Sequence, residues 1–269
     1  MVNVEDETAH GVVTSNHMKT FPRFLLLTSL VAVVSSTPLF AATTILDDFE
    51  VSEGHFTNDP DFSGTTQGET VTDGPSTADL TTTTAYQGTG SQQVFLDDDP
   101  AANVANPATF TWQLRHLSGG GTPANNVGFL NGGTTWVGYY LMTSTPNLQA
   151  SLMIDDGTGL ERAAYLPIIA DGGWHLYEWE LADTNMWEAF AGTGQNGEIN
   201  AATVTLDSIF ITALDSDPAN AGPDQDATFF VDAVAYNTEG RITVVPEPSG
   251  FLLAGLTALG ALSRRRREG

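Results

Sequence analysis

The sequence contains no cysteine. A domain without cysteine forms no disulfide and offers neither a thiolate ligand nor a cysteine nucleophile, so its stability depends on its core or on a bound ion. Basic residues are also rare, because residues 43–244 carry 28 acidic residues against three arginines and no lysine, a net charge of −25. Such a surface repels phosphate groups and anionic lipid, which excludes nucleic-acid binding and favours divalent cations.

The sequence also lacks the common catalytic motifs. It has no Gly-x-Ser-x-Gly elbow, no His-Glu-x-x-His pair and no phosphate-binding loop. Glu178 and Glu180 lie two residues apart on an expected strand, roughly 6.5 to 7 Å between Cα atoms, a separation that invites comparison with a glycosidase pair. No other feature marks them as acid and nucleophile, so we expect no catalytic residue and no enzyme activity. A secreted glycan-active enzyme is a second alternative.

No part of the body shows a sustained apolar period of 3.6 residues, and the best helical candidate, 182–191, is short enough to be a connection between strands. Seven segments are instead short and rich in β-branched and aromatic residues, which is typical of strands. They are 91–96, 108–114, 135–142, 149–154, 174–181, 208–212 and 228–236. Gly-rich and Asp-rich turns separate them. The pattern predicts an all-β domain, a two-sheet jelly-roll sandwich without the repeats of a propeller.

The C-terminal segment, residues 245–269, has three parts in a fixed order. Pro246, Glu247 and Pro248 form a stiff extended triplet, an uncharged run follows at 251–262, and four arginines, 264–267, come last. This order resembles the PEP-CTERM signal of Gram-negative bacteria, which directs an exported protein to an exosortase-type processing enzyme. The run reaches only roughly 20 Å as a helix, so we expect a short hydrophobic helix and a transient association of the precursor with the membrane.

The N-terminal segment fits export as well. Residues 18–42 have a basic start at Lys19 and Arg23, an apolar centre and small residues at Ala41 and Ala42, as in a secretory signal peptide with a signal helix. Residues 1–17 are acidic and precede that start. They are predicted to be a mis-called extension, with a genuine cytoplasmic extension as the alternative. The expected domain is therefore residues 43–244, which suits one β-sandwich.

Four segments of the body are similar to galactose-binding-like jelly rolls, which include many carbohydrate-binding modules. They are Ile45–Glu50, Gly88–Val94, Trp174–Leu181 and Phe230–Val234. In that family, acids of the first and last strands meet and often hold one structural calcium ion. The resemblance therefore implies a calcium site formed by Asp48, Glu50 and Asp232 with carbonyl oxygens near Gly90 and Gln92, because Ca²⁺ binds six to eight oxygens. Ordinary solvated strand-end acids are the alternative.

Aromatic residues bear on sugar binding, because pyranose rings stack on exposed Trp and Tyr faces. The body holds all five tryptophans. Trp136, Tyr139 and Tyr140 lie beside the Gly-rich turn at 131–133 and are the candidate exposed platform, with a core position as the alternative for each. In 174–181, alternation places His175, Tyr177, Trp179 and Leu181 on the packed face and Glu178 and Glu180 on the other.

These features predict an exported, non-catalytic protein of the cell envelope, outer surface or extracellular matrix. Its expected partners are an exosortase-type enzyme and polysaccharide, with no nucleic acid. A purely structural or adhesion protein of the matrix, without a glycan site, is the first alternative. An exposed line of aromatic rings on one sheet favours glycan binding, and fully buried rings favour the structural role.

Overall fold

The computed structural model describes residues 43–60, 66–68, 76–98, 110–214 and 226–243. The chain divides into two compact units, Met1–Leu39 and Phe40–Gly269, and every described residue belongs to the second. The predicted extension 1–17, the signal peptide 18–42 and the C-terminal hydrophobic helix lie outside the described residues. The described helices are three short 3-10 turns, η1 (Ser118–Gly121), η2 (Pro123–Asn125) and η3 (Thr184–Met186).

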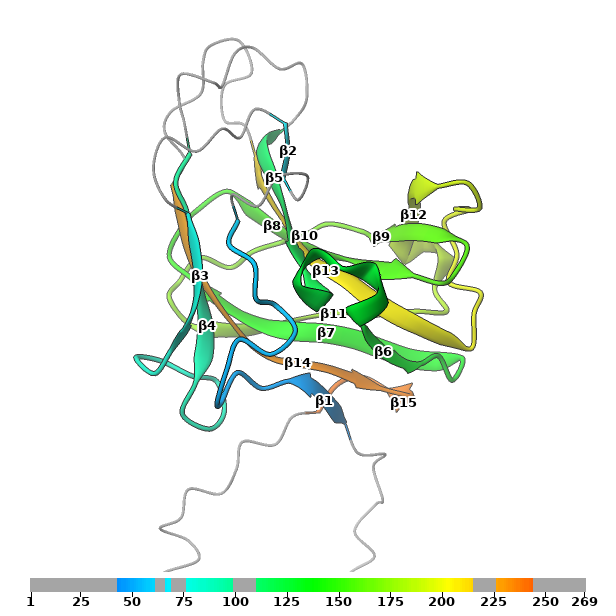
Figure 1. Ribbon diagram of the computed structural model, residues 1–269, viewed down its shortest axis with the longest axis horizontal. Coiled ribbons are helices and arrows are strands. Elements are labelled where there is room, and N and C mark those ends of the chain that lie inside the picture. Colours follow the sequence, from blue (N-terminus) through cyan, green and yellow to red (C-terminus); the bar gives the residue numbers. More distant parts are fainter. Residues whose placement is uncertain (1–42, 61–65, 69–75, 99–109, 215–225, 244–269) are drawn as a thin grey trace, which may run out of the picture. The chain divides into compact units, whose positions relative to one another are not determined.

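The described strands form two sheets that face each other (Figure 1). Sheet A has the order β11-β7-β14-β4-β3, with β1 paired to β14 and β15 paired to β7. Its strands are β1 (Thr44–Asp47), β3 (Thr77–Thr81), β4 (Ser91–Leu96), β7 (Thr134–Thr143), β11 (Trp174–Glu180), β14 (Ala227–Asn237) and β15 (Glu239–Gly240). All its pairings are antiparallel except that of β15 with β7.

Sheet B has the order β12-β9-β8-β13-β5-β2, with β10 paired to β8 and β6 paired to β13. Its strands are β2 (Thr66–Gly68), β5 (Phe110–Leu117), β6 (Val127–Leu130), β8 (Leu148–Asp155), β9 (Gly159–Ala163), β10 (Leu166–Pro167), β12 (Trp187–Gly192) and β13 (Thr203–Leu214). The chain crosses between the sheets several times, as from β4 to β5 and from β13 to β14. The predicted two-sheet jelly-roll sandwich is confirmed.

The seven predicted strands are all present. The segment 91–96 forms β4 with the same bounds, and the segments 208–212 and 228–236 are the centres of the longer strands β13 and β14. The helical candidate 182–191 instead contains η3 and most of β12. Strands β9 and β12 were not predicted, because a half-exposed strand with a glycine at an end has little apolar alternation.

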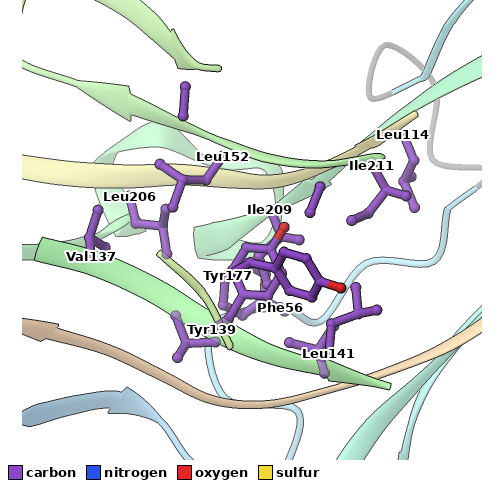
Figure 2. Packing of buried hydrophobic residues seen from close by; sticks show 14 of the residues in the cluster. Phe56, Leu114, Val137, Tyr139, Leu141, Leu152, Tyr177, Leu206, Ile209 and Ile211 are labelled. Atoms are coloured by element: carbon purple, nitrogen blue, oxygen red, sulfur yellow. The ribbon is translucent and has the colours of Figure 1, made fainter. Parts of the chain in front are cut away.

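The core lies between the sheets and follows from strand alternation. In β7, Val137, Tyr139 and Leu141 point inward and are at most 1% exposed. Figure 2 shows them facing residues of sheet B such as Leu152 and Ile209. Gly138 lies between two of these residues and opposite β11. A Cβ there would come within 2.2 Å of the carbonyl oxygen of Tyr177, so only glycine allows the two strands to pair this closely.

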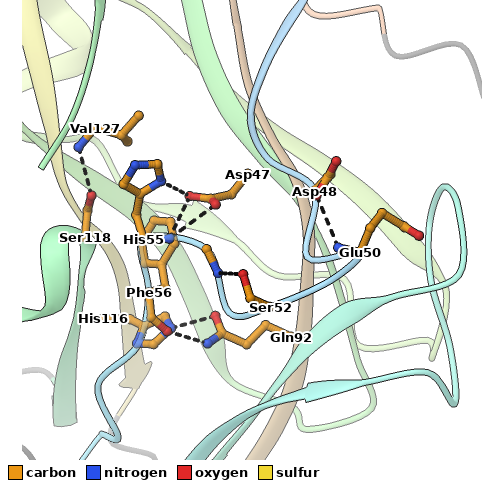
Figure 3. Close-up of polar contacts among 11 residues, drawn as sticks. Asp47, Asp48, Glu50, Ser52, His55, Phe56, Gln92, His116, Ser118 and Val127 are labelled. Atoms are coloured by element: carbon orange, nitrogen blue, oxygen red, sulfur yellow. Dashed lines mark hydrogen bonds and ion pairs between the residues drawn. The ribbon is translucent and has the colours of Figure 1, made fainter.

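Buried polar contacts also join the two sheets, and one involves Gln92 of β4. Its amide oxygen lies 2.8 Å from the ring Nε2 of His116 in β5, and its amide nitrogen donates to the carbonyl of Phe56 at 2.6 Å (Figure 3). Because the amide nitrogen donates to Phe56, the amide oxygen is left to accept from His116. Burial lowers the pKa of His116 to about 4, so the ring is neutral at pH 7.

Candidate functional site

The outer face of sheet B carries a group of charged and aromatic side chains that we name the polar–aromatic cluster. It consists of Gln113 and Arg115 from β5, Arg162 from β9, Tyr165 from the connection between β9 and β10, Glu188 and Phe190 from β12, and Asp207 and Phe210 from β13. The neighbours of Phe210 on β13, Ile209 and Ile211, belong to the core. Alternation therefore directs Phe210 to the opposite face, where it forms the centre of the cluster.

Arg162 lies between an acid and two aromatic rings. Its guanidinium carbon is 4.0 Å from the ring centroid of Tyr165 and 6.0 Å from that of Phe210. One of its amino groups forms an ion pair with the carboxylate of Glu188. The side chain of Arg162 is 12% exposed, whereas that of Glu188 is 63% exposed. A planar guanidinium that stacks on rings in this way is held in one orientation.

Arg115 has a similar environment on β5, with β8 and β13 between it and the strand of Arg162. It pairs with Asp207 at 2.8 Å, and its guanidinium carbon lies 5.8 Å from the ring centroid of Phe190. Asp207 also accepts a hydrogen bond from the hydroxyl of Ser208 at 2.9 Å. Both partners of the ion pair are mostly buried. The cluster thus contains two arginines and two acids, which balance in charge.

Tyr165 is the hydrogen-bonding centre of the cluster. Its hydroxyl oxygen accepts from the amide of Gln113 at 2.8 Å and from the hydroxyl of Thr212 at 3.4 Å. Burial raises the pKa of Tyr165, so the phenol keeps its proton and can donate it to a ligand oxygen. Two guanidinium nitrogens, Nε of Arg115 and Nη1 of Arg162, are buried and have no hydrogen-bond partner among the described residues. The exposed polar group of the cluster is the carboxylate of Glu188.

Sequence reasoning did not find this cluster. Apart from Tyr165, its residues come from strands β5, β9, β12 and β13, and β9 and β12 were not predicted. One signal was present, since the acidic body has three arginines in all, and two of them, Arg115 and Arg162, lie here. Only the pairing of β9 with β12 and of β13 with β5 brings their acidic and aromatic partners together.

The aromatic platform predicted around the turn at 131–133 does not form as expected. Tyr139 is 0% exposed, and its hydroxyl donates to the carbonyl of Ser151 at 2.8 Å, so its prediction as an exposed residue is wrong. Strand alternation is the reason, because Tyr139 shares the inner face with Val137. Trp136 and Tyr140 lie half-buried on the outer face of sheet A, where Tyr140 stacks on Tyr86 with centroids 3.5 Å apart.

The tryptophans divide between core and surface. Trp112, Trp179 and Trp187 are buried, at most 4% exposed, whereas Trp136 and Trp174 are half-buried. The predicted packed face of 174–181 is confirmed for Tyr177, Trp179 and Leu181. Three of the five tryptophans therefore lie in the core, and the other two are partly exposed.

Two of the three predicted calcium ligands reach the same loop. Asp232 accepts hydrogen bonds from the backbone of Tyr86 and Gln87, at 2.7 and 3.0 Å, and Glu50 accepts from Thr89 and Gly90, at 2.9 and 3.2 Å. Asp48 is exposed and accepts only from the amide of Glu50, at 3.1 Å (Figure 3). No three His, Asp or Glu side chains converge as a metal site within the described ranges. The structure thus places Asp48 apart from the loop at 86–90 that Asp232 and Glu50 contact.

Asp232 is the buried member of this pair. Burial raises its pKa to about 6, hydrogen bonds from three backbone amides oppose that shift, and the charge of Glu50 adds to it. For Glu50, burial also favours the neutral acid, but the hydrogen bonds from Thr89 and Gly90 prevail and lower its pKa. Gly90 has to be glycine, since a Cβ would lie 2.2 Å from the carbonyl oxygen of Phe49. The loop therefore packs closely against both acids.

Residues 244–267 match the family model of the PEP-CTERM protein-sorting motif. The chain carries a PEP-CTERM motif. The predicted sorting signal is thereby confirmed, and it marks an exported protein that is sorted to the cell envelope and processed by an exosortase-type enzyme. Within the part of the chain that the structure describes, no helix is long and apolar enough to cross a membrane.

Several solved structures have a similar strand arrangement. One is a β-1,2-glucanase from Parabacteroides distasonis, with 10% identity and a TM-score of 0.35 over 78% of this chain and 26% of the glucanase. A family 11 carbohydrate-binding module from a Clostridium thermocellum cellulase has 13% identity and a TM-score of 0.37, over 76% and 98% of the two chains. The CBM22-1 xylan-binding domain from Paenibacillus barcinonensis has 14% identity and a TM-score of 0.29, over 75% and 99%.

At these identities and scores, the likenesses carry no argument about ligand or activity. The chain spans about a quarter of the length of the glucanase, 26%. A comparison of the sequence with curated proteins finds no match. Any functional inference has to come from the residues themselves.

Proposed function

We propose that the exported β-sandwich is a non-catalytic carbohydrate-binding domain and that the glycan binds at the polar–aromatic cluster of sheet B. The observation that supports this is the stacking of Arg162 on Tyr165 beside Glu188, whose carboxylate side chain is 63% exposed. Sugars present apolar CH faces to rings and hydroxyl groups to charged and phenolic partners. This combination suits a polyhydroxylated ligand.

The charge of the protein favours an uncharged glycan. The two arginines of the cluster are balanced by Glu188 and Asp207, so the cluster offers no net positive charge to an anion. The body around it carries a net charge of −25, which repels polyanions over distances of about 10 Å at 0.1 M salt. We therefore propose neutral polysaccharide as the ligand class.

Absence of catalysis is part of the same proposal. The carboxylate pair that the sequence singled out is Glu178 and Glu180, and Glu178 is engaged with Arg241 and with the backbone of Ile242. A carboxylate occupied in this way is a poor acid or nucleophile for glycoside hydrolysis.

The test is affinity electrophoresis of the mature domain with soluble β-glucan, xylan and a polyuronate. Arg162→Lys keeps the charge but loses the planar stack and the fork of donors. We expect it to weaken binding of a neutral glycan about tenfold, the effect of losing about 1.4 kcal/mol. A matched melting curve shows whether the variant is folded.

Trp136→Ala is the control on the other sheet. We expect it to leave binding unchanged. If Trp136→Ala weakens binding and Arg162→Lys does not, the glycan binds at the aromatic residues of sheet A, Trp136 and Tyr140, that the sequence predicted. If none of the polysaccharides binds the wild-type domain, the proposal fails and the structural or adhesion role takes its place.

We propose calcium as a structural ion between Glu50 and Asp232, with carbonyl oxygens of the adjoining loop. The supporting observation is the raised pKa of a buried carboxylate that lies near a second acid. A divalent cation would compensate both charges, and oxygen ligands are the type that calcium binds. Asp48 is not part of this proposal.

Chelation of calcium is therefore expected to lower the melting temperature of the mature domain by several degrees. A ligand that binds only the folded state at a hundredfold its dissociation constant stabilises by about 2.7 kcal/mol. Melting is measured with calcium and with chelator at matched ionic strength, which separates binding from screening. Glu50→Gln should reduce the calcium effect and Asp48→Asn should not. Identical curves for the wild type would contradict a stabilising calcium site.

A further inference from the structure

The last described residues of the sandwich, Glu239–Thr243, form a strap that returns to sheet A. Its first part, β15, pairs with Thr134 and Thr135 at the start of β7. Its final amide, of Thr243, donates to the hydroxyl of Thr43 at 3.0 Å. The first and last described residues are thus side by side, at the end of the sandwich where Figure 1 shows β1 and β15.

The strap is held by one carboxylate of β11. Glu178 accepts a hydrogen bond from the amide of Ile242 at 2.9 Å with Oε2 and pairs with Nε of Arg241 at 3.2 Å with Oε1. The Arg241 guanidinium carbon lies 4.7 Å from the ring centroid of Trp136, and Ile242 is only 4% exposed. We name Trp136, Glu178, Arg241 and Ile242 the C-terminal clasp.

The clasp differs from an ordinary surface ion pair. Glu178 is 9% exposed, and burial raises its pKa, so the carboxylate is held at some cost. Arg241 is 71% exposed, so its ion pair contributes little by itself. The hold comes mainly from the buried Ile242 side chain and its amide. Glu180, on the same face of β11, has no hydrogen bond or ion pair to the strap within the described residues.

The position of the clasp relative to the PEP-CTERM motif is the decisive feature. Pro248, the last residue of the Pro-Glu-Pro triplet, follows Thr243 by five residues. Five residues reach at most about 18 Å when fully extended. While the strap is bound, chain length alone therefore keeps the triplet within that distance of Thr243. A processing enzyme then has to act within about 18 Å of the folded domain.

We propose that the C-terminal clasp restrains processing of the folded precursor, and that the processing enzyme acts when the strap has left Glu178. Glu178 and Trp136 are then positioning residues of the sorting reaction, which they influence through the reach of the chain. This inference rests on the PEP-CTERM motif and is independent of glycan binding.

The test is pulse-chase processing of the full-length chain in a host that contains the exosortase system, followed by intact mass to detect loss of Arg264–Arg267. Glu178→Ala removes the acceptor of the Ile242 amide together with the partner of Arg241. It should speed processing about tenfold, the shift in an opening equilibrium that follows from losing about 1.4 kcal/mol. Glu180→Ala is the matched control and should process at the wild-type rate.

A second variant has a six-residue Gly-Ser insert after Thr243. It leaves the clasp intact and adds about 20 Å of reach, so it should also process faster than the wild type. Wild-type rates for both Glu178→Ala and the insert would overturn the proposal. Faster processing of Glu178→Ala alone would do so as well, because it would reflect general loss of stability and not restricted reach. If Glu178→Ala does not fold, the insert decides.

Discussion

Replacing Asp232 by Ala is expected to lower the free energy of unfolding by about 2–4 kcal/mol. Asp232 is fully buried and accepts from the amides of Tyr86, Gln87 and Ala233. Its removal leaves these donors without an acceptor, and an unsatisfied buried donor costs about 1–3 kcal/mol. Removal of the buried charge offsets part of that cost. The expected loss is therefore smaller than the summed cost of three unsatisfied donors.

The measurement is urea unfolding at pH 7 in the presence of chelator, so that bound calcium does not contribute. Asp48→Ala is the control. Its exposed carboxylate accepts only one amide, that of Glu50, and we expect a loss below about 1 kcal/mol. Equal losses in the two variants would show that Asp232 is not the centre of the loop contact.

The second large effect is a pH dependence caused by His116. Burial lowers the pKa of its ring from 6.5 to about 4. The stability that the neutral ring contributes is fully present above pH 6.5 and is lost as the pH falls toward 4, because the unfolded chain takes up the proton first. A difference of about 2.5 units corresponds to about 3 kcal/mol.

Asp232 titrates in the opposite sense. Its pKa is raised from 3.8 to about 6, so its ionisation destabilises the folded state, and stability is regained as the pH falls from 6 toward 4. The two contributions partly cancel in the wild-type protein. The free energy of unfolding of His116→Gln, relative to that of the wild type, should therefore increase by about 3 kcal/mol as the pH falls from 6.5 to 4. Parallel wild-type and variant profiles from urea unfolding would contradict the assignment.

Several features of the fold were accessible from sequence because they depend on local patterns. Alternation of apolar and polar residues predicts which side chains of one strand share a face, and it placed Tyr177 and Trp179 together correctly. The same rule did not show which face of β7 is covered. Tyr139 and Tyr140 are neighbours of the same type, and only the packing of one face of β7 against sheet B buries the first and leaves the second partly exposed.

The contacts of the charged residues could not be predicted from local pattern either. The sequence places Glu178 and Glu180 on one strand face. Their different roles come from the strap, because Ile242, which lies 64 residues further along the chain, donates a hydrogen bond to Glu178 alone. The acids Asp48 and Glu50 are two residues apart, and the turn between them directs only Glu50 to the loop at 86–90. Contacts between distant segments depend on strand register, which no local pattern encodes.

By itself, the sequence determined the all-β class, the PEP-CTERM motif and the exclusion of disulfides and cysteine chemistry, because composition, short motifs and period-two alternation are local properties. The tertiary structure alone decided that Arg162 stacks on Tyr165 beside Glu188, that Asp232 is buried against the loop at 86–90, and that Glu178 holds the C-terminal strap. Each of these is a meeting of residues far apart in the chain, and the free energy that selects it comes from closing two sheets over one core.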